Sequence, residues 1–258
     1  MRFLVAVKQV PDTGRMSIDA DGNLVRSGSA GMLDPYCESA LLSALSLRTE
    51  GDTVEVFTMG PPQASTTLRR CLEIGADAAY LISDRALAGS DTWATSRALE
   101  AFLSRYGCDA ALVIFGRQTI DGGTGQVPFQ TARLLDVQQF AYVDSVRREG
   151  EGFVAVQSYD GLTRTAKVPL GSVVSFGGID LRGAIPTLQG HLDAQRKEIV
   201  EVDRVKLGLG LYSVGIKGSP TRIVRTQPNA PERKNRMVMI NNPATAADLL
   251  RQEMEGSR

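Results

Sequence analysis

The chain has 258 residues, of which 43% are hydrophobic and 22% charged, so its composition suits one α/β domain with an extension. Because 29 lysines and arginines balance 29 aspartates and glutamates, a globally basic surface for nucleic acid is not expected. The longest apolar runs, such as 3–7 and 110–115, are far shorter than the ~20 residues that span a bilayer. The N-terminus shows no signal-peptide pattern, so we expect a cytoplasmic protein without a transmembrane segment.

The first 136 residues alternate between short apolar runs and amphipathic segments. The apolar runs predict strands over 2–8, 53–58, 79–82 and 111–115. The amphipathic segments predict helices that begin at Asp34-Pro35, Gly60, Ser90-Asp91 and near Thr124. Aspartate is a typical helix cap and proline suits the first helical turn. This alternation indicates right-handed βαβ units around a parallel sheet.

After Asp136 the pattern changes to hairpins. Strands are predicted over 140–148, 153–159, 163–168 and 172–176, with Gly-rich turns at 149–152 and 160–161. The expected fold class is therefore a Rossmann-like domain over 1–200, with a mostly parallel sheet, helices on both faces and antiparallel strands at about 140–176. Residues 201–258 form a C-terminal extension with one helix at 244–254. Its Leu207, Leu209, Leu211 and Ile216 need burial, so we expect this extension to lie across a partner.

A glycine-rich loop, residues 116–127, follows the strand at 111–115. Ligands of open α/β sheets bind beyond the carboxyl ends of the parallel strands, where segments 6–9, 58–60 and 88–91 also end. The glycines let backbone N–H groups approach an anion, and the next helix points its positive end at the same place. We therefore expect a phosphate or nucleotide site, to which Thr124 and Gln126 add hydrogen bonds. An ordinary glycine-rich turn is the alternative, because the loop matches neither a P-loop nor the dinucleotide fingerprint.

Metal and nucleophilic chemistry have little support. Cys37, Cys71 and Cys108 are widely spaced without a CxxC pair, and His191 is the only histidine. A metal site needs closely spaced ligands, so we expect buried, unreactive thiols and no metal. His191 lies in a polar stretch without a nucleophile motif, which leaves no candidate catalytic residue.

Several motifs, in order, resemble the beta subunits of electron-transfer flavoproteins over nearly the whole chain. They are Val7-Lys8-Gln9-Val10-Pro11-Asp12-Thr13, Asp34-Pro35-Tyr36-Cys37-Glu38, Met59-Gly60-Pro61-Pro62-Gln63-Ala64, residues 68–77, Ala88-Gly89-Ser90-Asp91-Thr92 and the loop at 116–127. The resemblance implies a heterodimer with an alpha subunit, whose FAD faces residues 11–15, and an adenine nucleotide on this chain. Position by position, the nucleotide site would comprise Ala6, Lys8, Asp34, Met59, Asp121, Gly122, Gly123, Thr124, Gly125, Gln126 and Val127.

The resemblance also implies that Leu188 docks the redox partner, a dehydrogenase or a quinone-linked enzyme. An exposed leucine between polar residues suits a small anchor, and a leucine in the core is the alternative. The chain departs from the family at Asp34, which is usually asparagine, and at Gly123, where another acid is usual. It also departs at 181–184, usually part of an Asn-x-Pro-Arg stretch, and at Ser158, often glutamate. At these positions we expect a nucleotide contact, partner docking and the control of domain motion to differ from those of the family.

The nucleotide on this chain is expected to be a second FAD, with AMP as the alternative. Residues 121–127 are close to the Asp-Gly-x-Thr-x-Gln-Val form of the electron-bifurcating branch, which 217–221 and 10–13 also resemble, whereas AMP-binding members crowd three acids into this loop. A carboxylate ~4 Å from a phosphate costs roughly 4 kcal/mol at an effective dielectric of 20, so fewer acids suit a pyrophosphate. Cys37 looks more like the AMP type. Two flavins would split the electrons of NADH between ferredoxin and an acceptor of higher potential.

Other functions fit the sequence less well. One is a non-bifurcating beta subunit with structural AMP that serves an acyl-CoA dehydrogenase or a quinone-linked partner. A stand-alone nucleotide-binding protein would have no use for residues 201–258. An ATP-using ligase would need a Ser-Gly-Gly-x-Asp-Ser-like loop where this chain has Lys8-Gln9-Val10-Pro11-Asp12. A dehydrogenase in its own right lacks a substrate domain and acid/base residues, so we expect an electron-carrier subunit.

Overall fold

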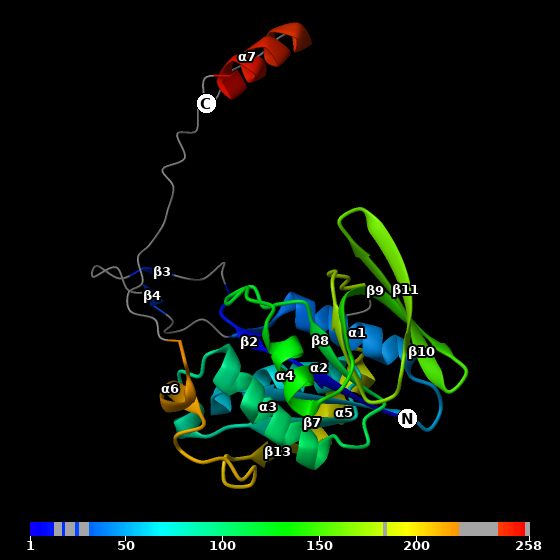
Figure 1. The fold of residues 1–258 in the computed structure, drawn as a ribbon, viewed down its shortest axis with the longest axis vertical. Helices are drawn as coiled ribbons and strands as arrows, with labels where there is room; N and C mark the ends of the chain where they lie inside the picture. The colour runs from blue at the N-terminus through cyan, green and yellow to red at the C-terminus, as the bar shows by residue number, and fades with distance from the viewer. Residues whose placement is uncertain (13–16, 19–23, 26–30, 183–184, 222–241, 256–258) are drawn as a thin grey trace. The chain divides into compact units, whose positions relative to one another are not determined.

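A mixed sheet of nine strands is the centre of the described part of the computed structural model (Figure 1). The strands lie in the order β11 (Leu162–Val168), β10 (Gly152–Tyr159), β9 (Gln139–Glu149), β12 (Ser172–Phe176), β8 (Leu112–Gly116), β1 (Arg2–Ala6), β6 (Thr53–Met59), β7 (Ala78–Ile82) and β13 (Ile199–Val202). Neighbours from β9 to β13 pair in parallel, whereas β9, β10 and β11 pair as antiparallel hairpins. The predicted fold class is therefore confirmed.

The structure describes residues 1–12, 17–18, 24–25, 31–182, 185–221 and 242–255. These residues fall into two units, Met1–Val224 and Arg225–Arg258. In the second unit α7 (Pro243–Glu255) confirms the helix expected at 244–254. The first unit also holds two short antiparallel pairs, β2 (Gln9–Val10) with β5 (Met32–Leu33) and β3 (Ser17–Ile18) with β4 (Leu24–Val25). It further holds two 3₁₀ turns, η2 (Pro62–Ala64) and η3 (Arg85–Leu87), and a short helix, α6 (Gly215–Gly218).

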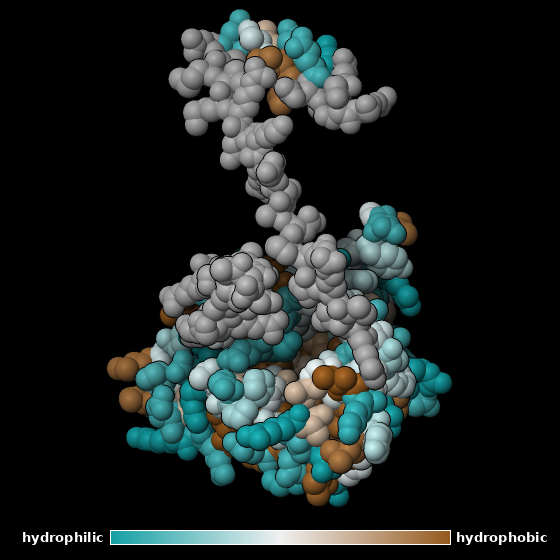
Figure 2. Space-filling view, turned by 90° about the vertical axis from the view of Figure 1, so that its left-hand side faces the viewer, coloured by the Kyte–Doolittle hydropathy of each residue, from teal (hydrophilic) through white to brown (hydrophobic). Residues whose placement is uncertain are grey.

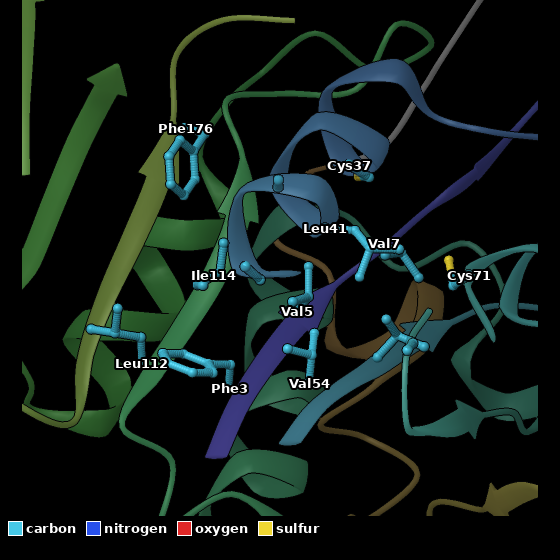
Figure 3. Packing of buried hydrophobic residues seen from close by; sticks show 14 of the residues in the cluster. Phe3, Val5, Val7, Cys37, Leu41, Val54, Cys71, Leu112, Ile114 and Phe176 are labelled. Atoms are coloured by element: carbon cyan, nitrogen blue, oxygen red, sulfur yellow. The ribbon is translucent and has the colours of Figure 1, made fainter. Parts of the chain in front are cut away.

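Helices cover both faces of the sheet. On one face lie α1 (Pro35–Leu47), α2 (Ser65–Ile74) and α5 (Leu188–Arg196), and on the other lie α3 (Thr92–Tyr106) and α4 (Val127–Leu135). Each face has its own hydrophobic core, because neighbouring strand residues such as Phe3 and Leu4 point in opposite directions. Figure 3 shows the first core, where α1 with Cys37 and Leu41 covers β1 and β8.

Local sequence signals set the helix boundaries. Asp34 caps α1 with bonds from the backbone N–H groups of the first turn, and Asp91 caps α3, as predicted. The fourth helix begins at Val127, so the prediction of a start near Thr124 was wrong by one turn. The reason lies in Gly123 and Gly125, whose φ of 62° belongs to the left-handed region and cannot continue a right-handed helix.

The compact unit continues past the boundary expected at residue 200. The chain adds β13 beside β7 and returns along the α3 side of the sheet, where α6 contacts α3. There Leu207 is buried in the second core and Leu209 packs against it. The expectation that these leucines need a partner for burial was therefore wrong, although Leu211 and Ile216 are exposed.

The three cysteines differ in exposure. Cys37 and Cys71 are buried, and burial raises the pKa of both thiols. Cys108 is exposed, because it lies in the turn between α3 and β8 rather than in the core, so the prediction of three buried thiols was wrong there. In the described residues, no helix is long and apolar enough to cross a membrane, and no cluster of three His, Cys, Asp or Glu side chains could hold a metal.

Candidate nucleotide-binding site

A pocket of about 520 Å³ lies where the parallel strands end. The chain runs from β1 to β6 and β7 on one side and then returns to β8 on the other, so the strand order reverses at β1. Residues that follow β1 and β8 line the pocket, which is the position where open α/β sheets bind ligands. Its volume falls within the ~300–1,000 Å³ typical of small-molecule sites.

The structure brings together most of the residues predicted for the nucleotide site. Those that line the pocket are Ala6, Lys8, Met59, Asp121, Gly122, Thr124, Gly125, Gln126 and Val127. Asp34 and Gly123 do not line it. The structure thus shows that these nine residues line one pocket. Their contact with a nucleotide stays a prediction. Of the segment predicted to face the alpha-subunit flavin, Thr13, Gly14 and Arg15 lie outside the described residues.

Asp34 is fully buried between α1 and the glycine-rich loop. Its Oδ1 accepts hydrogen bonds from the N–H groups of Tyr36 (2.9 Å) and Cys37 (3.3 Å), and its Oδ2 accepts one from the N–H of Ile120 (2.7 Å). Burial raises the pKa of this carboxyl, and the three backbone bonds act in the opposite direction. Both carboxylate oxygens therefore have backbone partners. Through the bond to Ile120, Asp34 holds the glycine-rich loop against the start of α1.

The loop conformation depends on glycine at particular positions. A Cβ on Gly116 would lie 2.7 Å from the carbonyl carbon of Tyr36, so only glycine lets β8 approach α1 this closely. Gly123 and Gly125 take φ of 62°, and the N–H of Gly123 donates to the carbonyl of Thr119 at 2.9 Å. The chain then enters α4, whose cap residue Gln126 makes no side-chain cap bond. Apart from Pro128, which has no N–H, the backbone N–H groups of this helix end therefore suit an anion.

Lys8 and Asp121 form a charged pair at the pocket, with 3.4 Å between Nζ and Oδ2. Burial acts to raise the pKa of Asp121, but the Thr119 hydroxyl and the Lys8 ammonium outweigh it and lower that pKa. Asp121 is thus ionised at neutral pH, and Lys8 offsets its charge beside the glycines. Both side chains are partly exposed, so the pair itself contributes little to stability.

One wall of the pocket was not assigned from the sequence. It consists of Ser90, Asp91, Thr92 and Thr95 at the start of α3, and of Thr221 late in the chain. The position of 88–91 after a strand was the signal for the first group. No spacing rule could bring Thr221 beside residues 130 positions earlier. Phe57, Leu99 and Phe115 add an apolar surface. Across the pocket, the hydroxyl of Thr92 donates to Oε1 of Gln126 at 2.9 Å and links the starts of α3 and α4.

The predicted docking residue Leu188 is the first residue of α5, and 77% of its surface is exposed. Its neighbour Thr187 caps the helix by accepting the N–H of Gly190 at 3.0 Å. Ile185 is also exposed. The alternative of a core leucine therefore fails, and the docking role stays a prediction.

Fold and pocket together define an open α/β protein with a small-molecule site at the reversal of its strand order. More narrowly, the chain belongs to the electron transfer flavoprotein family, since residues 21–206 match the "Electron transfer flavoprotein domain". Beta subunits of this family pair with an alpha subunit, and the family generally binds flavin or AMP.

Individual relatives agree with this assignment. "Caffeyl-CoA reductase-Etf complex subunit CarD" of Acetobacterium woodii is 38% identical over 229 residues, which cover 88% of this chain and 87% of that protein. "Electron transfer flavoprotein subunit beta" of Thermoanaerobacterium thermosaccharolyticum is 36% identical over 240 residues, 90% of each chain. "Protein FixA" of Azotobacter vinelandii is 36% identical over 249 residues, 91% of this chain and 86% of that protein. The resemblance to beta subunits is thereby confirmed.

Proposed function

We propose that this beta subunit binds a nucleotide cofactor in the pocket at β1 and β8, and that the cofactor is a second FAD. The observation that carries the proposal is the uncapped start of α4, joined to a loop with two glycines in the left-handed region at a pocket of about 520 Å³. Such a helix end offers backbone N–H donors and a partial positive charge to phosphate oxygens.

The other pocket residues fit a nucleotide. Phe57, Leu99 and Phe115 offer apolar surface to a planar ring. Thr58 lines the same pocket, and its hydroxyl is buried without a hydrogen-bond partner among the described residues. Because a buried hydroxyl needs a partner, this atom suits a site that a polar ligand or a water molecule completes.

The choice of FAD over AMP depends on charge. Asp121 is the single acidic residue of the loop 116–127, and Lys8 lies 3.4 Å from it. The loop therefore presents little net negative charge to the phosphates of a nucleotide, and it lacks the additional acids that the AMP-binding members of the family carry in this loop. A bound FAD would supply the hydride acceptance and single-electron transfer that the side chains of this chain cannot perform.

Structural AMP is the second candidate for the same pocket. Cys37 favours it, since this cysteine lines the pocket and resembles the AMP-binding members of the family at that position. In that case the chain would serve a single flavin on the alpha subunit and would not split electron pairs.

The relatives support a class of redox partner for this chain. One relative is a subunit of a caffeyl-CoA reductase complex, and "Acryloyl-CoA reductase electron transfer subunit gamma" of Anaerotignum propionicum is 35% identical over 236 residues. We propose that this chain and its alpha subunit pass electrons between NADH and an acyl-CoA reductase or dehydrogenase in the cytoplasm, with ferredoxin as the low-potential acceptor and a quinone-linked enzyme as the alternative partner. In this proposal Leu188 docks the partner enzyme and the C-terminal extension, residues 201–258, contacts the alpha subunit.

The flavin count of a variant complex tests the pocket. In the complex with the alpha subunit, Gly122→Asp should reduce two flavins per complex to one, because it adds a carboxylate beside the phosphates. Asp121→Ala should act in the same direction, because it removes the partner that holds Lys8. Gly210→Asp is the matched control, since Gly210 lies outside this pocket, has no positive φ, and a Cβ there would meet only the Ser213 hydroxyl at 3.9 Å. Unchanged nucleotide content in Gly122→Asp would contradict the assignment of this pocket.

A further inference from the structure

A late segment of the chain is fastened to the start of α3. The hydroxyl oxygen of Ser90 accepts the N–H of Gly215 (3.1 Å), and that of Ser219 accepts the N–H of Asp91 (2.8 Å). Oδ2 of Asp91 accepts both the N–H (2.9 Å) and the hydroxyl (2.7 Å) of Thr221. We call Ser90, Asp91, Ser219 and Thr221 the clasp. It places Thr221 at the pocket, a position that no local sequence pattern predicts.

The approach of the two segments is specific rather than incidental. Gly215 has φ of 60°, and a Cβ there would lie 2.1 Å from the carbonyl oxygen of Ala86. Ser219 is buried, and its hydroxyl donates to the carbonyl of Gly215 at 2.7 Å. The segment that carries Thr221 is therefore held by backbone packing as well as by the clasp.

The hydrogen bond to Asp91 determines whether the Thr221 hydroxyl can donate to a ligand or accept from it. A threonine hydroxyl has one proton, and Asp91 accepts it. The oxygen can therefore offer only lone pairs to a ligand. The other oxygen of Asp91 accepts the N–H of Ala94 at 3.0 Å, so this carboxylate caps α3 while it orients Thr221.

Two neighbouring parts of the pocket wall, joined by the Thr92–Gln126 hydrogen bond, therefore differ in the groups that they offer to a ligand. At the start of α4 the loop offers backbone donors, with Lys8 close by, and this part suits phosphate. At the clasp the pocket offers an acceptor beside a carboxylate, which repels phosphate and suits a neutral donor. A nucleotide carries both kinds of group, with phosphates on one half and hydroxyl or amino donors on the nucleoside half.

We propose that Thr221 is a specificity-determining residue of the nucleotide site, which accepts a hydrogen bond from a neutral donor on the nucleoside half, and that Asp91 is its positioning residue. The donor is either a ribose hydroxyl or the amino group of adenine. This inference rests on the proposed binding of an adenine nucleotide in the pocket. It adds the orientation of that nucleotide and the donor group that Thr221 recognises.

The test is calorimetric titration of the complex with its alpha subunit, after removal of the nucleotide bound to this chain. The probes are AMP, 2′-deoxy-AMP, 3′-deoxy-AMP and inosine monophosphate. The wild-type complex should bind AMP about five- to tenfold more tightly than the one analogue that lacks the recognised donor, the typical effect of a single hydrogen bond. Weaker binding of one deoxy analogue would identify the missing ribose hydroxyl as the donor. Weaker binding of inosine monophosphate would identify the amino group of adenine as the donor.

Three variants separate recognition from structure. Thr221→Val keeps the shape of the side chain but should lose this preference, whereas Thr221→Ser, which retains the hydroxyl, should keep it. Asp91→Asn can still cap α3 but no longer takes the Thr221 proton as a carboxylate does, so it should lose the preference without a large loss of thermal stability. The ratio of affinities is the decisive readout, because a purely structural role would weaken all four probes alike.

Failure of the inference is distinct from failure of the proposed function. If the wild-type complex binds none of the four nucleotides, the nucleotide site itself is wrong. If it binds all four equally, or if Thr221→Val retains the wild-type ratios, the nucleotide site stands and the role of Thr221 is overturned.

Discussion

Asp34 and Gly116 illustrate, at the scale of the residue, what the sequence could and could not reveal about the site. Residues whose backbone enters the pocket, such as Gly122 and Gly125, follow from the position of the loop after a parallel strand. Asp34 was expected as a ligand contact, but its oxygens bind backbone N–H groups of α1 and the loop. Sequence reasoning could not separate these roles, because a capping aspartate and a ligand-binding aspartate occupy the same kind of position.

Gly116 gives a prediction about the stability of the loop. Gly116→Ala places a methyl group 2.7 Å from the backbone of Tyr36, which forces β8 and α1 apart. We expect a loss of about 1–3 kcal/mol in the free energy of unfolding, measured by denaturant titration. Gly122→Ala is the control, since its Cβ would lie 3.4 Å from the Thr119 hydroxyl, an ordinary contact. Equal stability of the two variants would show that the close approach is not required.

At the scale of the element, most strands and helices were predictable because clear local sequence signals mark where they begin and end. The caps at Asp34 and Asp91 and the turns at 149–152 and 160–161 gave the boundaries of α1, α3 and the hairpins. The path of residues 203–221 was not predictable. It is fixed by contacts such as Asp91 with Thr221, which join positions 130 residues apart and leave no periodic pattern in the sequence.

Asp52 joins several elements and gives a pH-dependent prediction. Its carboxylate, 5% exposed, bonds the N-terminal ammonium of Met1, the backbone N–H of Thr49 and the guanidinium of Arg148 on β9. The amino terminus is the largest cause that lowers its pKa in the folded state, and burial opposes this. Because the folded pKa lies below the unfolded value of about 4, the stabilisation is present above pH ~4 and is lost as the pH falls through the folded pKa.

The variant Asp52→Asn should therefore lower the stability at pH 7 by about 2 kcal/mol. The difference in Tm from the wild type should shrink as the pH falls below 4, measured by thermal unfolding across a pH series. Asp144→Asn, at an exposed position of β9, is the matched control and should change neither value. A difference in Tm that stays constant across the pH series would mean that the negative charge of Asp52 does not contribute to the stability.

Leu188 gives a prediction for α5 as a docking element. Because its side chain is 77% exposed, Leu188→Ala should leave folding and nucleotide content unchanged. We expect electron transfer with the partner enzyme to slow by about tenfold or more, as for an interface anchor, in stopped-flow measurements. Leu162→Ala on β11, where the leucine is 64% exposed, is the control. Equal rates for both variants would assign docking to another surface.

At the scale of the whole molecule, the described part of the compact unit exposes apolar surface. Figure 2 shows hydrophobic residues among hydrophilic ones on one face of the compact unit. In the described part of this unit, the exposed large apolar residues after β13 are Val205, Leu211, Tyr212 and Ile216. Composition and pattern indicated a partner-dependent protein, and family membership supports an alpha subunit as that partner.

The nucleotide content of the complete complex tests the central claim most directly. The purified complex of this chain with its alpha subunit is denatured, and the released nucleotides are separated and quantified against protein. Our account predicts two FAD per complex and no AMP, because the loop 116–127 carries a single acid that Lys8 offsets. One FAD with one AMP per complex would contradict it.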